Sequence, residues 1–146
     1  MKGVTSLGHV AINVQDLGKS LDFYTRVMEF PEMMRLHKDD GSTWLVYLRI
    51  TDDQFLEIFP GADEERAPES WRSNGMTHMC LTVDDIEGVV KRLTAKGVRL
   101  IVPLKDGADG NRQAWVADPD GNRIEIMQMM PGCMQEKAIA RLRAIA

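Results

Sequence analysis

The chain reads LGHVAINVQDL over residues 7–17 and MTHMCLTVDDI over residues 76–86. Both stretches have the alternating character of a half-buried strand, and both end in an aspartate followed by an apolar residue. His9 and His78 occupy the same position in the two stretches, at an offset of 69 residues. A motif that returns at a fixed offset indicates an internal repeat, and a repeat constrains the whole fold.

A second pair of matching stretches supports the repeat. The chain reads FLEIF over residues 55–59 and RIEIM over residues 123–127, at an offset of 68 residues. Because this offset differs from the first by a single residue, the sequence predicts two copies of one module. We place the modules at about 7–60 and 76–129, with a solvated linker over 61–75.

Each module is expected to have the order β-α-β-β-β, which predicts an α+β chain. In the first module we expect strands over 8–14, 33–37, 44–50 and 54–59 and a helix over 17–28. In the second we expect strands over 77–83, 98–102, 113–117 and 123–128 and a helix over 86–96, followed by a C-terminal helix over 135–146. Asp16 and either Asp84 or Asp85 are candidate N-caps, and Gly97 is a candidate helix stop.

Composition limits the classes of protein that the chain can belong to. Its 146 residues are 27% charged and 44% hydrophobic, which is the balance of a single globular domain. A net charge of −4 argues against nucleic acid or an anionic membrane as partner. No apolar run is long enough to span a membrane, and residues 1–9 lack the apolar core of a signal peptide. With only two cysteines, we expect a reduced, cytoplasmic protein.

Trp71 lies in the predicted linker. We expect its side chain to anchor the linker to a core or to a partner.

Two glutamates stand in otherwise apolar strands, at equivalent positions of the repeat. An unpaired carboxylate at Glu57 or Glu125 would cost several kcal/mol to desolvate. Two of the chain's three histidines, His9 and His78, also fall on the repeat. A strand histidine is more often structural and a strand glutamate usually faces solvent, but their joint repetition favours a site for one first-row divalent ion. The third histidine, His37, has no repeat partner and is expected at the surface or a pocket rim.

The sequence resembles the vicinal oxygen chelate superfamily, and within it the short bacterial type of glyoxalase I. The resemblance covers about residues 7–130 and rests on the four positions above, on SLDFYTRV over residues 20–27 and on DPDG over residues 118–121. It implies that the two βαβββ modules form an open, curled mixed sheet. The metal site is then expected on the concave face of that sheet.

The resemblance also implies an activity. Glyoxalase I isomerises the hemithioacetal of a 2-oxoaldehyde through an enediolate, so the chain is expected to be a metal-dependent lyase or isomerase. Glu125 is the expected principal base and Glu57 its counterpart, and both also bind the metal. Nickel or cobalt is favoured over zinc. The expected assembly is a homodimer in which His9 and Glu57 of one chain meet His78 and Glu125 of the other.

Three arginines are candidates for holding glutathione or another carboxylate-bearing thiol. Arg26 and Arg92 match helix positions of glyoxalase I, and Arg112 lies in a glycine-containing loop before a strand, where the family places a mobile segment that contacts substrate. Each of the three is equally well explained as a solvated charge. Cys80 is expected to face the same side as His78, either as a small hydrophobe or with a redox or ligand role.

Several alternatives stay open at this point. The turn reads DPDGN over residues 118–122, where glyoxalase I commonly has an aromatic residue after the glycine. The main rival is another metalloenzyme of the superfamily, such as an α-carbon epimerase or a hydroxycarbonyl or keto-sugar isomerase. A drug-binding resistance protein of the same fold is less favoured, because such proteins generally lack the ligands.

Overall fold

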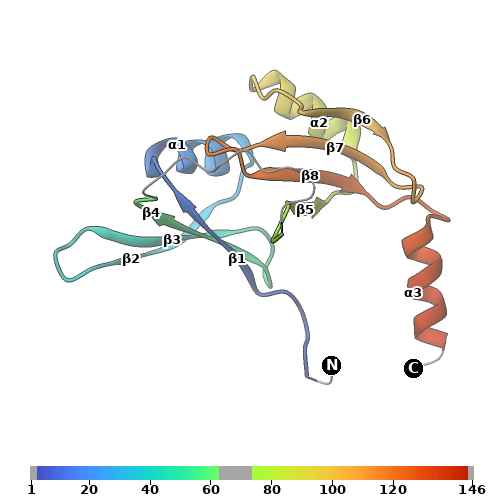
Figure 1. Ribbon diagram of the computed structural model, residues 1–146, viewed down its shortest axis with the longest axis horizontal. Helices are drawn as coiled ribbons and strands as arrows, with labels where there is room; N and C mark the ends of the chain where they lie inside the picture. The colour runs from blue at the N-terminus through green and yellow to red at the C-terminus, as the bar shows by residue number, and fades with distance from the viewer. Residues whose placement is uncertain (1–2, 63–73, 145–146) are drawn as a thin grey trace. The chain divides into compact units, whose positions relative to one another are not determined.

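The computed structural model describes residues 3–62 and 74–144. The predicted anchor Trp71 and most of the predicted linker lie outside the described residues, as do the last two residues of the predicted C-terminal helix. The chain divides into two compact units, Met1–Glu69 and Ser70–Ala146. Each unit is built on one four-stranded mixed sheet (Figure 1).

The described part of the first unit, residues 3–62, contains four strands and the two consecutive helical elements α1 and η1. In chain order its elements are β1 (His9–Val14), α1 (Leu17–Leu21), η1 (Asp22–Val27), β2 (Glu32–His37), β3 (Thr43–Arg49) and β4 (Phe55–Pro60). The strand order is β1-β4-β3-β2. Strands β1 and β4 are parallel, and the other neighbours are antiparallel.

The second unit repeats the same plan. Its elements are β5 (Met79–Thr82), α2 (Ile86–Ala95), β6 (Val102–Asp106), β7 (Arg112–Ala117), β8 (Arg123–Gln128) and α3 (Met134–Ala144). The strand order is β5-β8-β7-β6, again with the first and last strands of the module parallel. The predicted α+β fold with two repeated modules is therefore confirmed, and neither sheet is closed.

One face of each sheet is packed against a helix of its own unit. In the first unit, alternate residues of β3 and β4 such as Val46 and Ile58 are fully buried, together with Tyr24 of η1. In the second, Ile126 of β8 and Leu93 of α2 are buried, and α2 contacts β7 and β8 (Figure 1). Because strand residues alternate between faces, Glu57 and Glu125 lie on the opposite face of their sheets, away from these helices.

The predicted helix caps are found where the sequence placed them. Asp16 Oδ1 accepts a hydrogen bond from Lys19 N at 3.0 Å, and Asp85 Oδ1 accepts one from Gly88 N at 2.9 Å. Of the two candidates before α2, Asp85 is thus the cap. Gly97 has a φ of +83°, a conformation that glycine adopts without steric cost, and it follows the end of α2.

The predicted helix over 17–28 is found, but its second half is π-helical instead of α-helical. After α1 the chain widens into the π-helical segment η1, in which Met28 N donates to Phe23 O at 2.9 Å. One turn of a π-helix holds more residues than one turn of an α-helix, so the side chains of consecutive residues point in more similar directions. Phe23 and Tyr24 can therefore both be buried, with their ring centroids 5.1 Å apart.

The predicted strand over 98–102 is wrong, because β6 begins only at Val102. The amides of Lys96, Gly97 and Val98 all bond to carbonyls in the last turn of α2. These residues therefore finish the helix rather than join the sheet, and the ladder with β7 starts at the pair Val102–Trp115.

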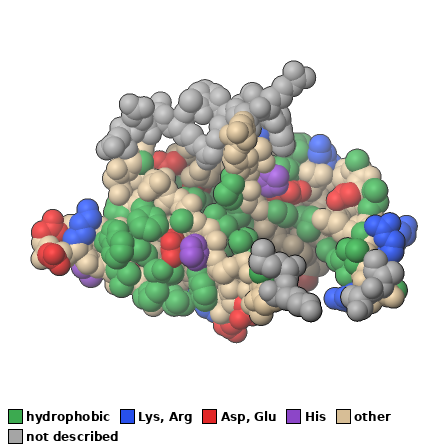
Figure 2. All heavy atoms as spheres, turned by 60° about the horizontal axis from the view of Figure 1, so that its bottom comes forward, with side chains coloured by type: hydrophobic (Ala, Val, Ile, Leu, Met, Phe, Trp, Pro, Cys, Tyr) green, Lys and Arg blue, Asp and Glu red, His purple; other side chains and the backbone are tan. Residues whose placement is uncertain are grey.

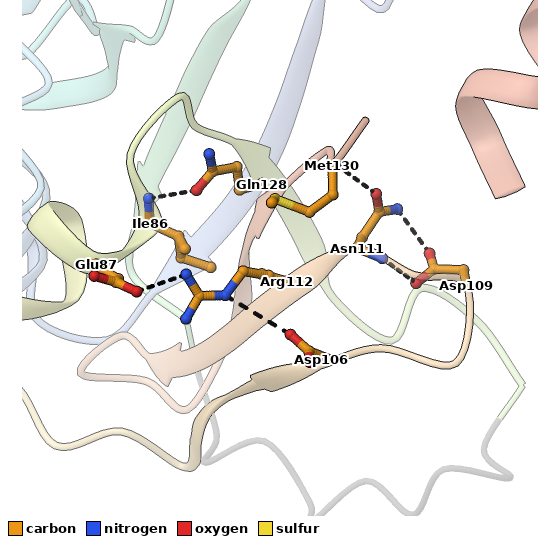
Figure 3. A network of polar contacts seen from close by, with 8 residues as sticks. All are labelled: Ile86, Glu87, Asp106, Asp109, Asn111, Arg112, Gln128 and Met130. Carbon is orange, nitrogen blue, oxygen red and sulfur yellow. Dashed lines mark hydrogen bonds and ion pairs between the residues drawn. The ribbon is translucent and has the colours of Figure 1, made fainter. Parts of the chain in front are cut away.

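A buried asparagine ties the start of α3 to the loop between β6 and β7. Asn111 is 1% exposed, and its Nδ2 donates to Asp109 Oδ2 at 2.8 Å and to Gln135 Oε1 at 2.6 Å. Its Oδ1 accepts from Met130 N at 3.2 Å (Figure 3). All polar atoms of this side chain are thus used in fixing one loop and one helix end.

Within the described residues, no helix is long and apolar enough to cross a membrane.

Replacing Asn111 by alanine is expected to lower the free energy of unfolding by about 1–3 kcal/mol, because Met130 N and Gln135 lose their partner. The loss should appear in urea denaturation and as faster amide exchange at the start of α3. Gln135→Ala removes one of the three bonds and should cost less. An Asn111→Ala protein as stable as the wild type would contradict the anchoring role.

Candidate metal centre

The first predicted ligand pair lies on adjacent parallel strands. Glu57 of β4 is in register with Ala11 of β1, and His9 stands two residues before Ala11 on the same face. His9 Nε2 lies 3.7 Å from Glu57 Oε2. The Glu57 residue is only 7% exposed, whereas the His9 side chain is 54% exposed. The sheet thus brings a buried carboxylate up to a surface imidazole.

The second pair has the same arrangement. Glu125 of β8 is in register with Cys80 of β5, and His78 stands two residues before Cys80. His78 Nε2 lies 3.2 Å from Glu125 Oε2. His78 was predicted inside a strand, but β5 begins one residue later at Met79. In the space-filling view, histidine side chains lie at the surface beside acidic ones (Figure 2).

Each glutamate is flanked on its other side by an aromatic residue that sequence reasoning missed. Tyr47 of β3 pairs with Glu57, and Trp115 of β7 pairs with Glu125. The Tyr47 hydroxyl hydrogen-bonds Glu57, which raises the pKa of Tyr47, with smaller contributions from burial and from the carboxylate charge. The Trp115 ring lies 4.6 Å from the ring of His78. A signal was present: an aromatic residue stands ten positions before each glutamate.

The distances within each pair suit two ligands of one ion. Two donor atoms that bind an ion at right angles, each about 2.1 Å from it, lie about 3 Å apart. The Nε2–Oε2 distances of 3.2 and 3.7 Å are close to this value. Neutral imidazole and carboxylate are also ligands that nickel, cobalt and zinc accept.

The structure brings the four predicted ligands together two by two, one pair in each unit. Within the part of the chain that the structure describes, no group of three or more His, Cys, Asp or Glu side chains forms a metal site. The single site made from all four residues therefore remains a prediction.

Cys80 lies beside Glu125, as expected from the strand register. The residue is exposed, yet its thiol is partly desolvated. This desolvation, together with the charge of Glu125 and a hydrogen bond to it, raises the pKa of the Cys80 thiol to about 12. A thiol of this kind is almost entirely protonated at neutral pH.

In the metal-free protein at pH 8, Cys80 is expected to react with iodoacetamide roughly 10²-fold more slowly than in the unfolded chain. The raised pKa lowers the thiolate fraction, and the greater nucleophilicity of a more basic thiolate offsets only part of this loss. Peptide mass spectrometry separates Cys80 from the buried Cys133. Equal rates for Cys80 in the folded and unfolded chains would rule the raised pKa out.

The three candidate arginines differ in their surroundings. Arg26 makes two 2.7 Å hydrogen bonds with Asp22, one turn earlier in η1. Arg112 Nη1 donates to Glu87 of α2 at 2.7 Å (Figure 3), and it is the first residue of β7 rather than part of the preceding loop. Arg92, on α2, has no ion pair with a described residue.

His37 lies at the end of β2, in the first unit. Its Nδ1 is 3.2 Å from Gly41 O, so the ring braces the turn between β2 and β3. This is a surface position, one of the two that the sequence allowed.

Known proteins resemble this chain over most of its length. Residues 6–126 match the model of the glyoxalase/bleomycin resistance protein/dioxygenase superfamily. A lactoylglutathione lyase of Neisseria meningitidis is 32% identical over 85% of this chain and 91% of its own. The mitochondrial methylmalonyl-CoA epimerase of Dictyostelium discoideum is 31% identical over 74% and 68%. A glyoxalase family protein from Enterococcus faecalis, known as a crystal structure, is 26% identical with a TM-score of 0.73, over 84% and 96% of the two chains.

Proposed function

Since this chain belongs to the glyoxalase/bleomycin resistance protein/dioxygenase superfamily, we propose that it is a metal-dependent lyase or isomerase of the glyoxalase I type. The observation that carries the proposal is the repeated pairing of a histidine with a strand glutamate, at 3.7 Å in one unit and 3.2 Å in the other. A drug-binding protein of this superfamily has no need of two such pairs.

His9, Glu57, His78 and Glu125 are the residues proposed to hold one divalent ion, with nickel or cobalt favoured and zinc possible. Such an ion, when bound, would polarise the adjacent oxygens of a substrate and so acidify the carbon next to them. The imidazoles supply neutral donors, and the two carboxylates balance the charge of the ion.

Glu125 is the proposed base. A carboxylate beside the substrate can take a proton from the carbon next to a carbonyl and return it to the neighbouring carbon. Glu57 has the equivalent place in the other module and is its proposed counterpart.

The proposed substrate is the hemithioacetal formed by a 2-oxoaldehyde and a thiol. The lactoylglutathione lyase relatives support it, and glutathione is the first thiol to test. Among the three candidate arginines, Arg92 is the most available to bind a substrate carboxylate, because it has no ion pair with a described residue. Arg26 and Arg112 would have to exchange Asp22 and Glu87 for a substrate carboxylate.

A second candidate is an epimerase acting on the carbon next to a thioester. The similarity to a methylmalonyl-CoA epimerase favours it, and the proposed proton transfer by two opposed carboxylates serves either reaction. The two candidates differ in the substrate, not in the metal site.

The proposed assembly is a homodimer in which each site takes one ligand pair from each chain. The face of the first sheet that bears His9 and Glu57 continues over β2 as exposed apolar surface. Met34 pairs with Tyr47 across the two strands and is 41% exposed. Leu36 pairs with Leu45 and is 38% exposed. Apolar surface next to a polar site is typical of a face that another subunit covers.

Both cysteines are free, which supports a reduced compartment such as the cytoplasm.

An assay of the nickel-loaded protein tests the proposal. It should isomerise the hemithioacetal of methylglyoxal and glutathione, and EDTA should abolish the activity. Turnover of methylmalonyl-CoA in place of the hemithioacetal would move the assignment to the epimerase. A nickel-loaded protein inactive on both substrates would overturn it.

A further inference from the structure

The two ligand pairs differ in how firmly the histidine is held. His9 follows Gly8, which has no side chain to contact the imidazole, and the His9 side chain is 54% exposed. His78 follows Thr77, whose Oγ1 lies 2.8 Å from His78 Nδ1. The His78 side chain is 27% exposed, half as much as that of His9.

His78 is also held from its ring face. The Trp115 ring centroid lies 4.6 Å from that of His78, at an interplanar angle of 56°. The Trp115 ring is fixed in turn, because its Nε1 donates to Gln113 Oε1 at 2.7 Å. With Nδ1 on Thr77 and the ring against Trp115, Nε2 is directed toward Glu125, at 3.2 Å.

We propose that Thr77 is a positioning residue that makes His78 and Glu125 the preformed half of the metal site. This inference rests on the proposed function, since it concerns the same ion. An imidazole that binds a metal through Nε2 carries its proton on Nδ1, and that N–H needs an acceptor. Thr77 Oγ1 stands in the place of that acceptor. His78 and Glu125 would therefore form the better ordered half of the site, and His9, which is more exposed, the less ordered half.

The contribution of a group that orients a metal-binding histidine is measurable. Removal of such a partner typically weakens metal binding by about 10–100-fold. Thr77→Val keeps the shape of the side chain but removes the hydroxyl, and Thr77→Ser keeps the hydroxyl. Thr94→Val is the matched control, because Thr94 also loses a hydroxyl bond, to Val90 O within α2, away from the ligands.

Nickel binding by isothermal titration calorimetry tests the proposal in the full-length protein. Thr77→Val should raise the dissociation constant by about 10–100-fold, while Thr77→Ser and Thr94→Val stay close to the wild type. The nitrogen NMR signals of the His78 ring give a second measurement in the metal-free protein. They should change in Thr77→Val and be restored in Thr77→Ser.

The possible failures are distinguishable. If the wild type binds nickel and Thr77→Val binds it equally well, the positioning role is wrong and the proposed function stands. Unchanged His78 ring signals in metal-free Thr77→Val would likewise overturn the role. If the wild type binds no nickel, cobalt or zinc, the proposed function itself fails, and the role of Thr77 toward the ion fails with it.

Discussion

Turnover is expected to fall by about 10²–10⁴-fold when Glu125 is replaced by glutamine, the usual range for loss of a general base. The amide keeps the shape of the side chain and one oxygen that can bind a metal, but it has almost no basicity. Turnover and metal occupancy have to be measured on the same sample. Slow turnover at full occupancy is the result expected of a base.

Two further measurements separate the base from the ligand. Glu57→Gln is the matched variant at the equivalent position of the other module, and it should lose less turnover than Glu125→Gln. If excess nickel restores the activity of Glu125→Gln, Glu125 is a ligand only. Full activity at full occupancy would instead assign the base to Glu57.

Nickel at about a thousandfold its dissociation constant is expected to raise the free energy of unfolding by about 4 kcal/mol. A ligand that binds only the folded chain stabilises it by mass action. His78→Ala removes the more firmly held histidine, so this gain should largely disappear. A hundredfold weaker site would retain only about 1.4 kcal/mol at the same nickel concentration.

His37→Ala is the control for this experiment, because His37 is the one histidine of the chain outside the two pairs. Its ring contacts Gly41 O at a turn, so the variant should keep the full gain from nickel. Denaturant unfolding with and without the ion, and again after EDTA, measures the effect. Equal losses in His37→Ala and His78→Ala would contradict the assignment of the ligands.

Much of the fold could be predicted from the sequence because the module is repeated. The offset between the histidines and the offset between the glutamates predicted the module boundaries. The alternation within each strand predicted which side chains share one face of the sheet. Strand registers in the two units agree with this: Glu57 pairs with Ala11 as Glu125 pairs with Cys80. Local chemistry also sufficed for the cap at Asp16 and for the end of α2 at Gly97, and it narrowed the second cap to Asp84 or Asp85.

The features that escaped prediction depend on contacts between elements. Strand β6 begins late because the residues before it bond back to α2, which no periodicity reveals. The segment η1 is π-helical where two adjacent aromatic side chains are both buried, and helix propensity does not anticipate this. Tyr47 and Trp115 were missed because an antiparallel neighbour is known only once the register is known.

The central claim is that His9, Glu57, His78 and Glu125 bind one divalent ion. An anomalous difference map from crystals grown with nickel, recorded at the nickel absorption edge, tests it most directly. We predict one strong peak per site, within about 2.0–2.2 Å of both Nε2 atoms and of one oxygen of each glutamate. A map whose nickel peaks lie away from these four side chains, or that places the two pairs at separate ions, would contradict the claim.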